Sequence, residues 1–235
     1  MRKSVVSWLS LFSVLCCTAS VAVAGVRADE TRPVSGFHGV SNSGSIKVEV
    51  TLGNTESVRL TGDDDLIDEI ETVVENGILK IRYKNQRRTE GRQWGTVTAY
   101  VAARRLDALS QSGSGSIIVS GRISGDELNG ALSGSGSLTF DADVAECNAS
   151  ISGSGRITVN GKAERTNVTL SGSGRFSGEK LKSGSASLQL SGSGNIFIYA
   201  ENQLNASISG SGNVHYSGNA QTNVRTSGSG RLRKM

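Results

Sequence analysis

Seven copies of the tetrapeptide Ser-Gly-Ser-Gly recur through the second half of this 235-residue chain. They begin at Ser112, Ser133, Ser152, Ser171, Ser191, Ser209 and Ser227, so the intervals are 21, 19, 19, 20, 18 and 18 residues. Even spacing of this kind is typical of repeat architectures. Collagen is excluded because it needs Gly at every third position and abundant Pro, whereas this chain has 30 Gly and 1 Pro.

Apolar residues recur at fixed distances from each copy, which distinguishes these segments from a flexible Ser/Gly linker. Five residues after the first Ser, the chain has Ile117, Leu138, Ile157, Phe176, Ile196, Val214 and Leu232. The positions seven after it, and one and three before it, are also mainly apolar, and polar residues alternate with them as in β-strands. Two or three short strands per 18–21-residue repeat, without a helical pattern, predict an all-β solenoid whose coils stack in register at about 4.8 Å.

The alternation also predicts which side chains face out. Both glycines of the tetrapeptide fall in phase with the inward positions, and both serines fall in phase with the outward ones. Four residues before the first Ser, Asn recurs at positions 129, 148, 167, 205 and 223, which predicts a stacked Asn ladder. Three of these asparagines match the glycosylation sequon, and we interpret that match as a by-product of the repeat.

The N-terminal part of the chain continues the alternation without the strict tetrapeptide. Ser43-Gly44-Ser45, followed by alternating apolar residues, predicts one degenerate coil, and Asn76-Gly77 predicts a hairpin turn. Residues 85–93 are polar and basic and are typical of a loop. We therefore assign residues 25–110 to capping and degenerate coils, and residues 111–235 to regular coils of the same domain.

Residues 1–24 read as a signal peptide for export. Arg2 and Lys3 precede a short apolar stretch, and Ala22-Val23-Ala24 supplies small residues for cleavage. Export would leave 23 basic and 21 acidic residues, a net charge of +2, which disfavours nucleic acid as a partner. No later apolar run reaches the ~20 residues of a membrane helix, so we expect a periplasmic or secreted protein with no membrane span. Cys147 would be the one cysteine left, as a small core residue.

Several segments together resemble one family of exported bacterial proteins, the auto-transporter adhesin "head GIN" family. The segments are Phe37-His-Gly-Val40, Val58-Arg-Leu-Thr-Gly-Asp-Asp64, Asn76-Gly77-Ile-Leu-Lys-Ile81, and Leu106-Asp-Ala-Leu109 leading into the first Ser-Gly-Ser-Gly. The resemblance covers nearly the whole exported chain. It implies a right-handed, single-stranded parallel β-helix similar in shape to pectate lyases, and it carries no catalytic residues over to this chain.

The outward positions lack the groups that catalysis on polysaccharides requires. Four residues after the first Ser they are Ser116, Ser137, Arg156, Arg175, Asn195, Asn213 and Arg231, and six after it they also contain no Asp or Glu. Glycoside hydrolysis needs a pair of carboxylates. His38 and His215 have no neighbours at metal-ligand spacing, so we predict no metal and no cofactor.

Arg156 and Arg175 share one phase in successive repeats and are the candidate ligand-binding residues. Two adjacent arginines without carboxylates favour an anion, such as an acidic glycan or a cell-surface polymer, although two solvated arginines would give the same pattern. We predict an exported, non-catalytic adhesin or glycan-binding module. The alternatives are a structural or signalling component of the cell envelope, and a polysaccharide-active enzyme. The sequence leaves the oligomeric state open.

Overall fold

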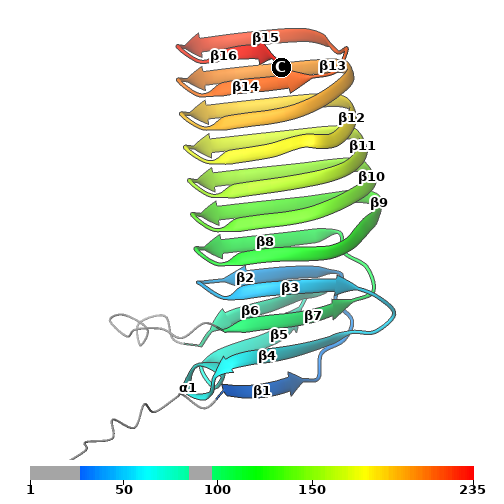
Figure 1. Ribbon diagram of the computed structural model, residues 1–235, viewed down its shortest axis with the longest axis vertical. Helices are drawn as coiled ribbons and strands as arrows, with labels where there is room; N and C mark the ends of the chain where they lie inside the picture. Colours follow the sequence, from blue (N-terminus) through cyan, green and yellow to red (C-terminus); the bar gives the residue numbers. More distant parts are fainter. Residues whose placement is uncertain (1–26, 85–96) are drawn as a thin grey trace, which may run out of the picture.

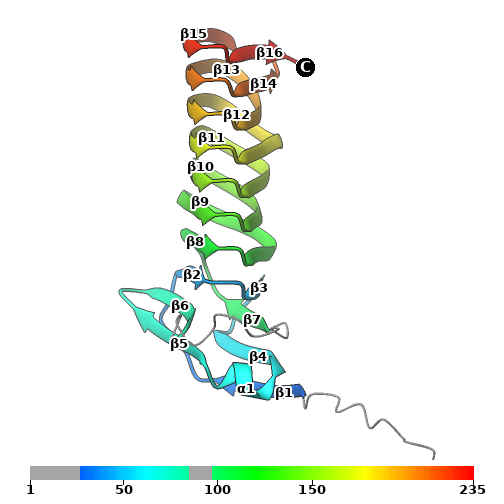
Figure 2. The same cartoon turned by 90° about the vertical axis from the view of Figure 1, so that its left-hand side faces the viewer.

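The computed structural model describes residues 27–84 and 97–235, and it forms a β-solenoid (Figure 1). The regular coils stack into a column, with the N-terminal strands at one end and the C-terminus at the other (Figures 1 and 2). The expectations for residues 1–24 and 85–93 lie outside the described residues.

Each regular coil is one long strand that runs through a bend near its middle. The bend lies at residues 141–146 in one coil and at residues 160–165 in the next. The regular strands are β9 (Ser116–Gly134), β10 (Ser137–Gly153), β11 (Arg156–Gly172), β12 (Arg175–Gly192) and β13 (Asn195–Gly210). The prediction of two or three short strands per repeat was wrong in this respect, because the parallel pairing continues around the bend. Between β10 and β11 it runs from Ser137↔Arg156 to Gly153↔Gly172.

The bend absorbs the variation in repeat length. Between β9 and β10 the register shifts only between Thr139 and Asp141, and between β11 and β12 only between Thr158 and Asn160. The corner and the segments on either side of it therefore keep one geometry, whether the interval is 18 or 21 residues.

The core is a narrow slab between the two halves of each coil. In β10 the inward side chains are Leu138, Phe140, Ala142, Val144, Cys147, Ala149 and Ile151, all buried. Cys147 is the small core residue that the sequence predicted, and burial raises the pKa of its thiol to about 12. Thr166 and Ser183, also buried, hydrogen-bond to each other at 2.6 Å.

The N-terminal strands extend this stack. They are β1 (Arg27–Arg32), β2 (Gly39–Ser43), β3 (Lys47–Leu52), β4 (Ser57–Asp63), β5 (Ile70–Glu75), β6 (Ile78–Tyr83), β7 (Thr98–Ala103) and β8 (Ala108–Gly113). Strand β2 pairs in parallel with β8, and β3 with β9, so Gly44 forms a corner next to Gly113.

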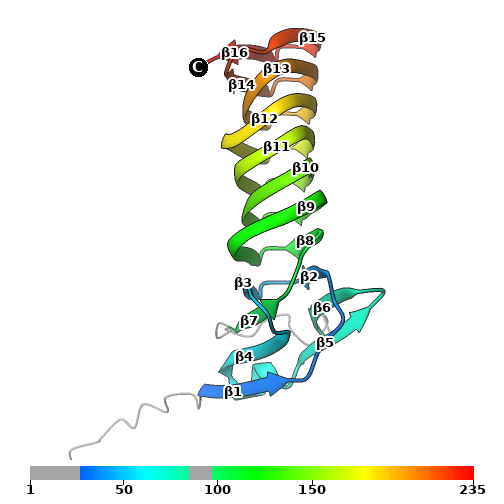
Figure 3. The same ribbon diagram turned by 90° about the vertical axis from the view of Figure 1, so that its right-hand side faces the viewer.

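Antiparallel pairs replace the parallel stacking at this end of the column. Strands β1 and β4 pair antiparallel, as do β4 and β7. The Asn76-Gly77 turn joins β5 and β6 into the predicted hairpin, which projects sideways (Figure 3). The only described helix is the short α1 (Asp64–Ile67).

The last complete coil is divided between two strands. Strand β14 (Asn213–Ser217) and strand β15 (Gln221–Gly228) pair with the two halves of β13. Strand β16 (Arg231–Lys234) pairs with β14 and ends the column. No helix among residues 27–84 and 97–235 has the length and hydropathy needed to cross a lipid bilayer.

Candidate functional site

The Ser-Gly-Ser-Gly corners stack so closely that they leave no space for side chains at the glycines. The first Gly of each copy has a positive φ, +115° at Gly153. The second is buried, and a Cβ on Gly155 would lie 2.6 Å from the carbonyl oxygen of Gly136. The second glycine, such as Gly155, therefore faces inward as predicted. The first, such as Gly153, is only half-buried because it lies at the turn.

The serines of these corners line a shallow groove that runs along the column. The groove has a volume of about 480 Å³ and extends from the corner of β9 to the start of β13. Ser135, Ser154 and Ser173 line it together with Arg156 and Arg175. Its walls therefore offer hydroxyl groups and two guanidinium groups, a donor-rich lining suited to a ligand with oxygen acceptors.

Arg156 and Arg175 lie side by side at the start of β11 and β12. They are direct register partners, and both are exposed. Ser137 occupies the equivalent position on one side and Asn195 on the other. The proximity predicted from the sequence is thus confirmed by the register.

These two arginines differ from the cations at the bend. Arg165 pairs with Glu146 at 3.3 Å, and Lys162 pairs with Asp143 at 3.2 Å. By contrast, no carboxylate among the described residues lies within 4.0 Å of a guanidinium nitrogen of Arg156 or Arg175. Their charges are therefore not compensated by an ion pair within the described part of the chain.

Arg175 has an aromatic neighbour, Phe197, that the repeat pattern did not predict. Its guanidinium carbon lies 4.8 Å from the centroid of the Phe197 ring. Phe197 in turn stacks on His215, with centroids 4.7 Å apart and ring planes 9° from parallel. Phe197 and His215 are register partners at an outward position, so their rings can stack. The contact of Arg175 with Phe197 crosses between two outward positions and depends on the side-chain conformation of Arg175.

The described surface around the groove contains hydroxyl, amide and guanidinium groups. Among residues 27–84 and 97–235, no three metal-ligating side chains of His, Cys, Asp or Glu cluster together. His38 forms a 2.7 Å contact with Asp107 at the base of the regular coils, far along the column from His215. No described acid lines the groove that could serve as a general acid or base.

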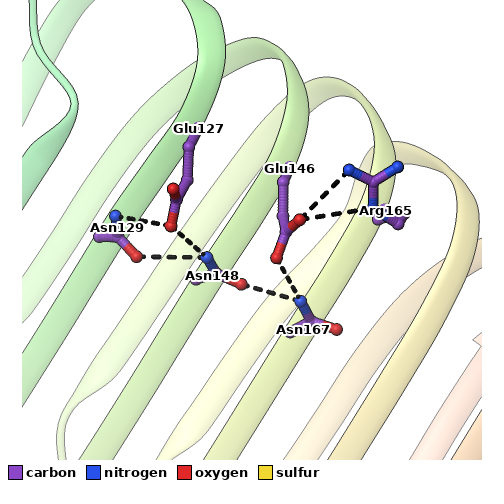
Figure 4. A network of polar contacts seen from close by, with 6 residues as sticks. All are labelled: Glu127, Asn129, Glu146, Asn148, Arg165 and Asn167. Carbon is purple, nitrogen blue, oxygen red and sulfur yellow. Dashed lines mark hydrogen bonds and ion pairs between the residues drawn. The ribbon is translucent and has the colours of Figure 1, made fainter.

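The asparagine ladder lies on the half of the coils that precedes each corner (Figure 4). Asn148 donates to Asn129 at 3.2 Å, and Asn167 donates to Asn148 at 2.9 Å. Glu127 and Glu146 accept from the same amides (Figure 4). These amides bond to one another and to the carboxylates, so the ladder stabilises the stacking of the coils.

Comparison with solved structures identifies the fold. A crystal structure described as a putative adhesin from Bacteroides fragilis is 17% identical, with a TM-score of 0.81 over 89% of this chain and 97% of its own. One described as a putative lipid binding protein from Parabacteroides distasonis is 24% identical, with a TM-score of 0.71 over 90% and 98%. A putative adhesin from Parabacteroides merdae is 19% identical, with a TM-score of 0.70 over 90% and 97%.

At these identities the structural similarity establishes the fold alone. No curated protein matches the sequence. The sequence family described as "putative auto-transporter adhesin, head GIN domain" matches residues 36–220, from the strands below the first regular coil to the last coil. The chain therefore belongs to the head GIN domain family.

Proposed function

We propose that this protein is an exported, non-catalytic binding module that attaches to an acidic glycan or cell-surface polymer through Arg156 and Arg175. The supporting observation is the pair of exposed, register-matched arginines at a hydroxyl-lined groove, without a described carboxylate partner. Membership of an adhesin family agrees with this function. Export rests on the signal-like residues 1–24.

Two adjacent like charges are unfavourable on a strand pair. An anion shared between the two guanidinium groups would offset that repulsion with charge-assisted hydrogen bonds. The corner serines next to them can donate to or accept from sugar hydroxyls. A carboxylated or sulfated polysaccharide supplies both kinds of group, whereas a neutral glycan would leave the arginines unpaired.

Binding of polygalacturonate to the chain from Gly25 onward tests the proposal. We expect binding at low ionic strength that weakens as salt screens the charges. The double variant Arg156→Ser/Arg175→Ser should lose most of this affinity and keep the circular dichroism spectrum of the parent. The control Arg122→Ser/Arg165→Ser removes the same charge from the bend and should bind like the parent.

Two results would overturn the proposal: no binding by the parent at low salt, or equal loss of affinity in the two double variants. Release of unsaturated or reducing ends from the polysaccharide would instead support the enzymatic alternative.

A further inference from the structure

The exposed cations on this side of the column form two pairs rather than one. The column of residues that contains Arg156 and Arg175 continues through Asn195 and Asn213 to Arg231, each in direct register with the next. Arg233 lies beside Arg231 on β16 and is in register with His215. Arg231 and Arg233 are both exposed.

The positive charges of the second pair, like those of the first, have no described carboxylate partner. No carboxylate among the described residues lies within 4.0 Å of a guanidinium nitrogen of Arg231 or Arg233. Of the cations on β16, Lys234 has a described aromatic partner, Tyr216, with its amino nitrogen 5.9 Å from the ring centroid. Both arginine pairs are therefore open to an external anion.

Among the described residues, no acid lies on the surface between the pairs. Asn195 and Asn213 occupy the column itself and present amide groups that can donate to sugar hydroxyls or ring oxygens. Phe197 and His215 occupy the adjacent outward column, and their stack connects Arg175 with the position beside Arg233. A negatively charged chain could cross this strip without meeting a described carboxylate.

The coil spacing fixes the separation of the two pairs. Arg175 and Arg231 are three register steps apart, which corresponds to about 14 Å at the usual distance between strands. A single phosphate, sulfate or monosaccharide is too short to contact both. A linear polyanion lying parallel to the column axis would contact both and would gain from the two contacts being tethered.

We propose that the ligand is a linear acidic polysaccharide that lies along the column and contacts a second subsite, Arg231 and Arg233, in addition to Arg156 and Arg175. This inference rests on the proposed function and extends it from one anion site to a track with two. It makes the length of the ligand, and not only its charge, a determinant of affinity.

Affinities for a short and a long ligand test the inference. Digalacturonate is too short to reach from Arg175 to Arg231, whereas polygalacturonate spans the distance. The variant Arg231→Ser/Arg233→Ser should weaken polygalacturonate binding by at least about tenfold, because one of two tethered contacts is lost. It should leave the binding of digalacturonate at Arg156 and Arg175 unchanged, since the first pair is intact.

The controls separate this inference from the proposed function. Arg156→Ser/Arg175→Ser should weaken both ligands, and Arg122→Ser/Arg165→Ser should weaken neither. An unchanged affinity of Arg231→Ser/Arg233→Ser for polygalacturonate would overturn the second subsite and leave the first standing. Equal weakening of both ligands by that variant would also overturn it, because a long-range charge effect would then account for the loss. Failure of the parent to bind polygalacturonate would instead overturn the proposed function.

Discussion

At the scale of single residues, the alternation of side chains determines what each substitution does. Ile196 is fully buried, and its neighbour Asn195 lies on the outer surface of the same strand. The sequence predicted this pair of orientations from the phase of the tetrapeptide, and the burial confirms it. Adjacent residues in one strand therefore provide a matched test of the register.

We expect Ile196→Asp to destabilise the fold by several kcal/mol, because it places an unpaired charge among apolar side chains. Asn195→Asp should change the free energy of unfolding by no more than about 0.5 kcal/mol, as is usual for surface substitutions. Urea unfolding of both variants measures the difference. Similar midpoints for the two would contradict the assigned register.

The glycines make a second residue-scale prediction. In Gly155→Ala the new Cβ would lie 2.6 Å from the Gly136 carbonyl oxygen, so the stacked corners must move apart. Gly125 lies exposed at the bend, where a Cβ would meet no atom within 4 Å, so Gly125→Ala is the matched control. We expect Gly155→Ala to cost about 1–3 kcal/mol and Gly125→Ala to be neutral. Thermal unfolding followed by circular dichroism compares them, and equal melting temperatures would show that the corners tolerate a methyl group.

At the scale of elements, the corners were predictable and the bends were not. Seven identical tetrapeptides mark the corners in the sequence, because Gly is required where backbones approach closely. The bends carry different residues in every coil, such as Asp141 to Glu146 in β10 and Asn160 to Arg165 in β11. Their shape depends on pairing with the neighbouring coil, so the sequence of one repeat does not reveal that its strand continues through the bend.

The candidate site was also predictable only in part. Periodicity was sufficient to place Arg156 beside Arg175, because register follows from the repeat. The contact of Arg175 with Phe197 was missed, because it joins two different outward columns through a side-chain conformation. The lack of a described ion pair at the two arginines could be seen only in the structure, because it depends on which cations the nearby acids contact. Asp143 pairs with Lys162, and Glu146 pairs with Arg165.

At the scale of the whole molecule, the column is a stack in which each coil contacts mainly its two neighbours. Strand β11 pairs with β10 on one side and β12 on the other. The stability of such a protein is approximately the sum of the coils and the interfaces between them. The structure should therefore accept the loss of one complete coil but not of part of a coil.

Deletion of residues 156–174 removes one 19-residue interval and places Arg175 in register with Ser137. The corner glycines and the inward apolar residues keep their alignment, and Ser187 takes the place of Asn167 beside Asn148. We therefore expect a folded solenoid with a lower melting temperature. Deletion of residues 156–164 removes about half of the coil, so the next corner comes too early in the chain to stack on its neighbours. That variant should lose cooperative unfolding. Circular dichroism and urea titration of the two deletions distinguish them, and a complete-coil deletion that fails to fold would show that the coils are not interchangeable units.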